Sequence, residues 1–294
     1  MLAEPDPQHQ ANQPLDGPKF DLLILEFTAS AMACALETFG NLNGALIFAA
    51  AARACGPFDQ PHARRRPVSI NALAASLDRP FETVRRHATA LIDQGILTRS
   101  PGGLSVSVQA IADPNVAGMI DYGHDLLVRL IEDCRTVGFA LPPARADMTY
   151  DPRSGAGIAL DLMLAAVECH GRREDHLTRL ALLLAIEWAD RRRCTDNGNI
   201  ATGQAIRTSV AARILGLPYA TASRNIEGLV GAGLLRRTSD GLAPVEENEI
   251  AAECRIAIAN RTRQLVGRLI QTGFPMQQPA TAYIRRRPPP PNLI

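Results

Sequence analysis

One segment of this 294-residue chain occurs twice, with its two copies 138 residues apart. Residues 74–104 and 212–242 align without a gap and share eleven identities in 31 positions. Unrelated segments of ordinary composition would share about two. The identical pairs are Ala74/Ala212, Leu77/Leu215, Pro80/Pro218, Thr83/Thr221, Arg86/Arg224, Leu91/Leu229, Gly95/Gly233, Leu97/Leu235, Arg99/Arg237, Gly103/Gly241 and Leu104/Leu242. Such a duplication predicts a fold made of two related halves.

The pattern within each copy predicts two helices followed by a β-hairpin. In the first copy, residues 70–77 have the spacing of a short amphipathic helix, and Pro80 suits the start of a second helix because its missing N–H needs no partner there. The apolar face of the second helix is Val84, Ala88 and Leu91, and a glycine ends it; the second copy has Ala222, Ile226, Leu229 and Gly233 in these roles. Two short strands around a Pro-Gly-Gly or Ser-Asp-Gly turn follow in each copy.

The flanking sequence predicts further helices and the boundaries of the two halves. Apolar helices are expected at 20–38, 41–55, 125–139, 156–170, 179–194 and 263–274. The predicted organisation is a disordered tail at 1–18, a first half at 19–140, a linker at 141–155, a second half at 156–278 and a disordered proline-rich tail at 279–294. The four helices 20–38, 125–139, 156–170 and 263–274 are expected to share one core.

Composition places the chain among globular proteins, with 46% hydrophobic and 21% charged residues. The formal net charge is only +1, and every basic residue except Lys19 is arginine, a bias that a GC-rich genome also produces. The six cysteines form no CxxC pair, which indicates reduced thiols. The N-terminus does not read as a signal peptide, and no apolar run approaches the roughly 18 residues of a membrane helix, so a soluble cytoplasmic protein without membrane partners is expected.

The repeated segment resembles the winged helix-turn-helix of bacterial transcription regulators of the MarR type. The resemblance rests on "LGLPYATASRNIEGLVGAGLLRR" (215–237) and covers about forty residues per copy; the first copy departs from the pattern with Asp78 at the turn glycine and Arg85 at the usual serine. The fold class implied is mainly α with small β-wings: two tandem winged helix-turn-helix domains, at 68–108 and 206–246, joined by helices with pseudo-two-fold symmetry. The chain would then be a monomer with pseudo-dimeric halves or a homodimer.

The resemblance implies a sequence-specific transcription regulator whose partner is double-stranded DNA, located in the cytoplasm with the nucleoid. In such proteins the second helix enters the major groove and the wing reaches the backbone. The residues carried over are Phe81, Glu82, Thr83, Arg85, Arg86, Arg99, Tyr219, Thr221, Ser223, Arg224, Arg236 and Arg237. No cofactor is expected, and a small-molecule effector is left open.

Other chemistry has weaker support. The cluster 168–176 gathers Cys, His, Glu and Asp, but it lacks the paired spacing of a metal site and is interpreted as a polar bend. No catalytic motif occurs, so an enzyme is not expected, and neither His87 nor His124 has an evident carboxylate partner. The basic clusters 62–67 and 190–194 are either secondary phosphate contacts or exposed ends. Trp188 is expected in a core or an interface.

Two alternatives stay open from the sequence. The chain could be a tandem winged-helix scaffold that binds proteins, or a replication or chromosome-organisation factor. For a DNA reader, the outward positions have diverged between the copies: Glu82 against Ala220, Arg85 against Ser223, and His87 against Asn225. The divergence predicts that one chain reads two unlike half-sites.

Overall fold

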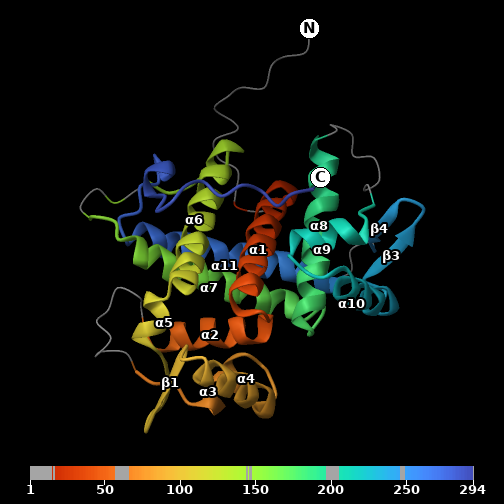
Figure 1. The fold of residues 1–294 in the computed structure, drawn as a ribbon. Helices are drawn as coiled ribbons and strands as arrows, with labels where there is room; N and C mark the ends of the chain where they lie inside the picture. The colour runs from red at the N-terminus through yellow and green to blue at the C-terminus, as the bar shows by residue number, and fades with distance from the viewer. Residues whose placement is uncertain are drawn as a thin grey trace.

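The computed structural model describes residue 15 and residues 17–56, 66–143, 145, 148–196, 205–245 and 249–293, with the backbone alone for 193–196. It is mainly helical, with two small antiparallel hairpins (Figure 1). The first half contains α1 (Gly17–Phe39), α2 (Leu42–Ala54), α3 (Ile70–Ser76), α4 (Phe81–Asp93), β1 (Leu97–Ser100), β2 (Gly103–Val106), α5 (Val108–Ala112) and α6 (Pro114–Thr136). The second contains α7 (Pro152–Gly171), α8 (Leu177–Asp196), α9 (Thr208–Ile214), α10 (Tyr219–Gly231), β3 (Leu235–Thr238), β4 (Gly241–Pro244), α11 (Glu249–Ile270) and the 3-10 turn η3 (Pro279–Ala282).

The duplicated segments have the same backbone arrangement. The hairpin ladder pairs Leu97 with Val106 in the first half and Leu235 with Pro244 in the second. The second pair follows the first by the repeat offset of 138 residues. A single extra bridge extends each hairpin, Val68 with Leu104 and Ile206 with Leu242. The duplication seen in the sequence is therefore also a structural repeat of helix, turn, helix and hairpin.

The extra bridge requires a glycine at one position of each copy, Gly103 in the first and Gly241 in the second. Gly103 has φ +128°, and a Cβ added there would lie 2.4 Å from the carbonyl oxygen of Val68. Gly241 has φ +145°, and its Cβ would lie 2.6 Å from the carbonyl oxygen of Ile206. A side chain fits neither position, because the bridging backbone passes too close and the conformation favours glycine.

Local signals explain where several helices begin. Side chains of Asn41, Ser69, Ser107, Asp113 and Asp151 accept hydrogen bonds from backbone N–H groups in the first turns of α2, α3, α5, α6 and α7. The Asp113 cap and the following proline start α6 well before the residue 125 expected from apolar spacing. Likewise α11 begins at Glu249 rather than 263, and α5 was not expected.

The halves are interlocked rather than separate. In Figure 1, α1 stands between α6 and α8, with α7 and α11 running behind it. The first helix of each half packs on the second helix of the other: α1 contacts α8, and α7 contacts α2. Buried residues of α1, α6, α7 and α11, including Phe20, Leu127, Leu162 and Leu269, form one cluster. This is the shared helical core predicted from the sequence.

The first helix is more apolar than the sequence analysis allowed. Among the described residues, α1 is the one helix long and apolar enough to cross a membrane by length and composition, with a mean hydropathy of 1.5. The most apolar stretch of α1 is 61% buried between the other helices, as a core helix would be. The expectation that no apolar run approaches 18 residues was therefore wrong, and burial supplies the reason for this apolar sequence.

The two predicted tails have different outcomes. Most of residues 1–18 lie outside the described part, although Gly17 and Pro18 already belong to α1. The C-terminal residues 279–293 were expected to be disordered, and this was wrong: they run from η3 along α6 and across α1 towards α8 (Figure 1). Long-range hydrogen bonds to α6 hold this segment, and a composition-based argument does not detect them.

Candidate nucleic-acid interface

Helices α4 and α10 hold most of the sequence-predicted site residues, and both begin in the same way. Pro80 and Pro218 occupy the N-cap positions, and no side chain caps either helix. One face of each helix is buried, through Val84, Ala88 and Leu91 or through the equivalent Ala222, Ile226 and Leu229. The opposite face and the uncapped start of each helix are therefore on the surface of the molecule.

The first helix–hairpin surface consists of Phe81, Glu82, Thr83, Arg85 and Arg86 on α4 with Arg99 on β1. Phe81 is 47% exposed although it is aromatic. Arg85 donates two hydrogen bonds to Glu82, at 2.8 and 2.6 Å. The Arg85 hydrogen bond is the main cause that lowers the pKa of Glu82. One of the predicted arginines is thus already paired within its helix.

The second helix–hairpin surface consists of Tyr219, Thr221, Ser223 and Arg224 on α10 with Arg236 and Arg237 on β3. Tyr219 is 61% exposed. Arg237 donates a hydrogen bond to Glu227, so that the hairpin is tied to α10 by an exposed ion pair. In the first half, Thr89 stands at the position of Glu227, and its hydroxyl donates to the carbonyl oxygen of Arg85 instead.

The contacts separate the retained residues into those with a packing role and those without one. Leu91, Leu97, Leu104 and their counterparts are buried, and the retained glycines provide turns with positive φ. Arg86 and Arg224 are exposed, and neither forms an ion pair within the described ranges. Packing therefore accounts for most of the eleven identities but not for this arginine pair.

The next outward position differs between the two helices. His87 is partly buried, and its Nε2 has no hydrogen-bond partner among the described residues. Burial, and next the charge of Arg86, lower the pKa of His87, so the ring is neutral near pH 7. Its counterpart Asn225 donates to the carbonyl oxygen of Thr221 at 2.8 Å. The two helices thus present different hydrogen-bonding groups at matched positions.

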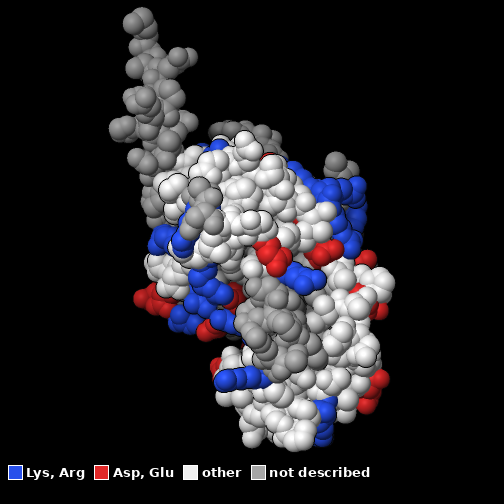
Figure 2. Space-filling view, turned by 90° about the vertical axis from the view of Figure 1, so that its left-hand side faces the viewer, with Lys and Arg blue, Asp and Glu red and all other residues white. Residues whose placement is uncertain are grey.

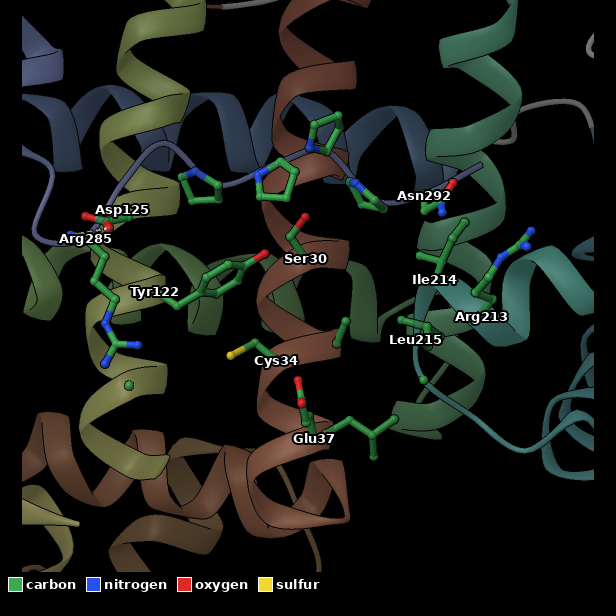
Figure 3. A pocket seen from close by; sticks show the side chains of 18 of the residues that line it. Ser30, Cys34, Glu37, Tyr122, Asp125, Arg213, Ile214, Leu215, Arg285 and Asn292 are labelled. Carbon is green, nitrogen blue, oxygen red and sulfur yellow. Dashed lines mark hydrogen bonds between the residues drawn. The ribbon is translucent and has the colours of Figure 1, made fainter. Parts of the chain in front are cut away.

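Two cavities that the sequence did not indicate border equivalent turns of the repeat, residues 213–216 and 75–78, although their other walls correspond only in part. The first, about 870 Å³, lies between the end of α9, α1 and α6 and is lined by Arg213, Ile214, Leu215, Ser30 and Tyr122, with the proline run 288–291 along its edge (Figure 3). The second, about 670 Å³, lies between the end of α3, α2 and α7 and is lined by Ala75, Ser76, Leu77 and Leu164. The proline run has no counterpart at the second cavity.

A buried polar network joins the halves. The carboxylate of Glu26 on α1 accepts a hydrogen bond from Arg129 on α6 and another from the indole of Trp188 on α8, at 2.9 Å. Arg129 also donates to the carbonyl oxygen of Pro288 at 3.0 Å. Trp188 is therefore a core residue between the halves, and its indole N–H is satisfied there.

His124 has a carboxylate partner after all, which corrects the sequence analysis. Its Nδ1 lies 3.1 Å from the carboxylate of Asp125, and its Nε2 lies 2.7 Å from the Tyr150 hydroxyl. The partner is the next residue along α6, a spacing at which side chains on a helix do not normally face each other. Burial lowers the pKa of His124 despite Asp125. The cluster ties α6 to the residues just before α7, and no step of chemistry follows from it.

The secondary clusters are engaged inside the molecule where they are described. Arg191 and Arg192 lie 3.7 Å from Asp21 and 3.5 Å from Glu26, which leaves them less suited to phosphate. Most of 62–67 lies outside the described residues. In 168–176, Glu174 accepts a hydrogen bond from the backbone N–H of His176 at 2.9 Å, and the described part of the chain holds no group of three metal-ligating side chains. The described cysteines form no disulfide.

Charge on the remaining surface is mixed. Figure 2, which views the side that carries α6, shows Lys and Arg in separate groups with Asp and Glu beside them. The arginines of the C-terminal segment belong to such groups, since Arg285 lies 3.2 Å from Asp121 and Arg287 pairs with Glu132 and Asp133. The side chains of Arg285 and Arg287 are thus held by acidic residues of the chain itself.

Comparison with known proteins gives no match to a family model, to a curated protein or to a solved structure.

Proposed function

We propose that the chain is a sequence-specific double-stranded-DNA-binding transcription regulator that uses α4 and α10 as recognition helices and the two hairpins as wings. In this reading each half is a winged helix-turn-helix of the MarR type. The observation that carries the proposal is the exposed pair Arg86 and Arg224, which both copies retain and which no packing or ion pair in the described residues explains. Each arginine is in the second turn of its helix, and an arginine on a recognition helix can bind guanine through two hydrogen bonds.

Further features support a nucleic-acid partner. Both helices begin at an uncapped N-terminus, whose N–H groups and dipole attract a phosphate. Thr83 and Thr221 lie in the first turn, where hydroxyl groups suit phosphate contacts. Arg99 and Arg237 lie on the outer strand of each hairpin, at the position from which a wing reaches the backbone.

The two surfaces are proposed to read unlike half-sites. In the first, Glu82 can accept from the amino group of cytosine, whereas Ala220 at the same place can offer only apolar contact. Selection of bound duplexes from a random library tests this. We expect an asymmetric consensus, and exchange of residues 219–225 for the sequence of 81–87 should make it more symmetric. A palindrome selected by the natural chain would contradict unlike reading.

The proposal as a whole is tested by mobility shifts with the selected duplex at two salt concentrations. Replacing either Arg86 or Arg224 with alanine should weaken binding by about 1–3 kcal/mol, while Arg153→Ala serves as the control. Arg153 is also exposed, so the control removes the same charge away from both hairpins. Binding should fall steeply with salt, because phosphate contacts release counterions. No binding to any duplex at low salt, or equal loss from all three variants, would contradict the proposal.

One observation favours a second function, a tandem winged-helix scaffold for proteins. Phe81 and Tyr219 are exposed aromatic residues at matched positions, and aromatic side chains are enriched in protein interfaces. With a net charge of +1, the chain has no overall attraction to DNA. Under this reading, Phe81→Ala and Tyr219→Ala would abolish capture of a protein partner, and no duplex would bind.

A further inference from the structure

We infer that the C-terminal segment Ile284–Leu293, here called the C-terminal strap, fixes the second helix–hairpin unit to the central helices, while the first unit has no such strap. The inference concerns how the two units are attached, and it holds whatever they bind. Its basis is the path of the strap, which starts on α6, crosses α1 and ends beside α9 (Figures 1 and 3).

The beginning of the strap is anchored to a single buried carboxylate. Asp125 accepts hydrogen bonds from the backbone N–H groups of Ile284, Arg285 and Arg286, at 2.8, 3.0 and 3.3 Å. Asp125 is 1% exposed. Hydrogen bonds to a buried charged group are stronger than those between neutral groups, and their loss would leave the carboxylate unsatisfied. This end is therefore firmly attached to α6.

Arginines of the strap and of α6 both hold the middle of the strap. Arg287 of the strap pairs with Glu132 and Asp133 of α6, and Arg129 of α6 donates to the carbonyl oxygen of Pro288. Pro288 is buried, and it is the first of a run of four prolines, 288–291. Because each proline has a fixed φ, the run is stiff and transmits the position of the α6 anchor along its length.

The far end of the strap meets the second unit. Asn292 lies at the rim of the cavity beside Arg213 and Ile214 of α9, and Figure 3 shows it next to Ile214. Leu293 is partly buried and packs on the large core cluster, which includes Ile214 and Leu215 of the second unit and also buried residues of the first unit and of the central helices. The strap thus spans the cavity of about 870 Å³ that lies between α9 and α6.

The first unit provides the internal comparison. The end of α3 borders the cavity of about 670 Å³ between α2 and α7, and no proline run lines that cavity as the strap lines the first. There, Arg79 donates to the carbonyl oxygen of Asp175 at 2.6 Å, from a largely exposed position. One hydrogen bond contributes little net stability, so we expect α3 to open more readily than α9 in the intact protein.

Hydrogen–deuterium exchange of the full-length protein and of two variants tests the inference. One variant ends after Pro291, and the other is full-length Leu293→Ser, which keeps the rest of the strap. In both, amides of residues 211–217 should exchange roughly tenfold faster, while those of residues 73–79 stay unchanged. Ile284→Ser is the matched control, because Ile284 is an exposed strap residue at the α6 end.

Two results would overturn the inference. Unchanged exchange at 211–217 in both variants would mean that the strap does not hold α9. Equal acceleration at 73–79 and 211–217 would mean general destabilisation rather than a specific attachment. The measurement uses no DNA, so its failure is distinct from failure of the proposed function. If DNA binding is shown separately, strap variants should loosen contacts of the second half-site only.

Discussion

The two halves carry the same helix, turn, helix and hairpin but differ in what surrounds them. The ladders match residue for residue, and the extra bridges occupy the same places. The first unit is attached across its cavity by Arg79, whereas the second has the C-terminal strap. Local sequence therefore specifies the unit itself, and non-repeated residues specify how each unit is attached.

Charge pairing on the exposed faces differs in a similar way. In the first half the ion pair lies within α4, between Glu82 and Arg85. In the second it joins Glu227 of α10 to Arg237 of the hairpin. Arg99, the counterpart of Arg237, has no acidic partner among the described residues. The arrangement of the exposed arginines is thus the feature in which the two surfaces differ most.

The largest expected effect tests the part that the halves share. Gly103→Ala and Gly241→Ala should each destabilise the protein by about 3 kcal/mol or more, because each combines an unfavourable φ with a clash against backbone. Urea unfolding measures the loss. Gly231→Ala, at the end of α10 with no atom near the added Cβ, is the control and should change stability little. A small effect at only one of the two glycines would show that the repeat is less exact than the ladders indicate.

A second prediction concerns a residue that differs between the first helices of the halves. His170 of α7 is buried beside Glu187, Arg173 and Arg191, whereas α1 contains no histidine. Burial lowers the pKa of His170 to about 4. Since the unfolded chain binds this proton near pH 6.5, the folded state loses stability as the pH falls below that value, by about 2 kcal/mol at pH 5.

His170→Leu should remove this part of the pH dependence, because leucine takes up no proton. Urea midpoints of the natural chain and of the variant at pH 7 and pH 5 measure it. Carboxylates contribute equally to both proteins, so the difference between their slopes isolates His170. Identical slopes would mean that folding does not lower the pKa of His170 and that its surroundings are more polar than the structure has them.

The sequence was sufficient for the elements that local patterns define. Local sequence alone specifies the apolar faces of α4 and α10, the prolines before these helices and the glycines after them. Each of these features depends only on residues a few positions away in the chain. The same reasoning placed the exposed candidates, since residues opposite a buried face must point outward. The shared helical core was also predictable, because each half has apolar flanking helices that need a partner.

The missed features depend on residues far apart in the chain. Asp125 accepts hydrogen bonds from a segment about 160 residues away in the chain. Nothing in a proline-rich sequence indicates that its backbone will bind a buried carboxylate. The exchange of packing partners, α1 on α8 and α7 on α2, is equally invisible to local periodicity. The cavities follow from that exchange, so they could not be predicted either.

A third prediction makes the turns of the two halves alike. Asp78 has φ +48° and is the one described non-glycine residue with positive φ, whereas Gly216 occupies the same turn in the second half. Asp78→Gly should stabilise the protein by roughly 0.5–1 kcal/mol, because glycine adopts this conformation without strain. The reciprocal Gly216→Asp should cost about 1 kcal/mol. Thermal unfolding measures both, and a destabilising Asp78→Gly would show that the Asp78 side chain makes a contact worth more than the strain.

The smallest expected effect on stability tests the difference in charge pairing. Glu227→Thr gives the second half the residue that the first half has at Thr89, and it removes the acidic partner of Arg237. Both members of the pair are more than half exposed, so the free energy of unfolding should change by less than about 0.5 kcal/mol.

Under the proposed function the freed Arg237 gains a phosphate contact, which should steepen the dependence of log K on log salt by about 0.9. The reciprocal Thr89→Glu should place a carboxylate near Arg99 and make that dependence shallower by a similar amount. Mobility shifts across a salt series measure both variants, with urea unfolding as the stability control. If Glu227→Thr leaves the salt dependence unchanged, Arg237 does not contact DNA, and the wing of the second half must be removed from the proposed interface.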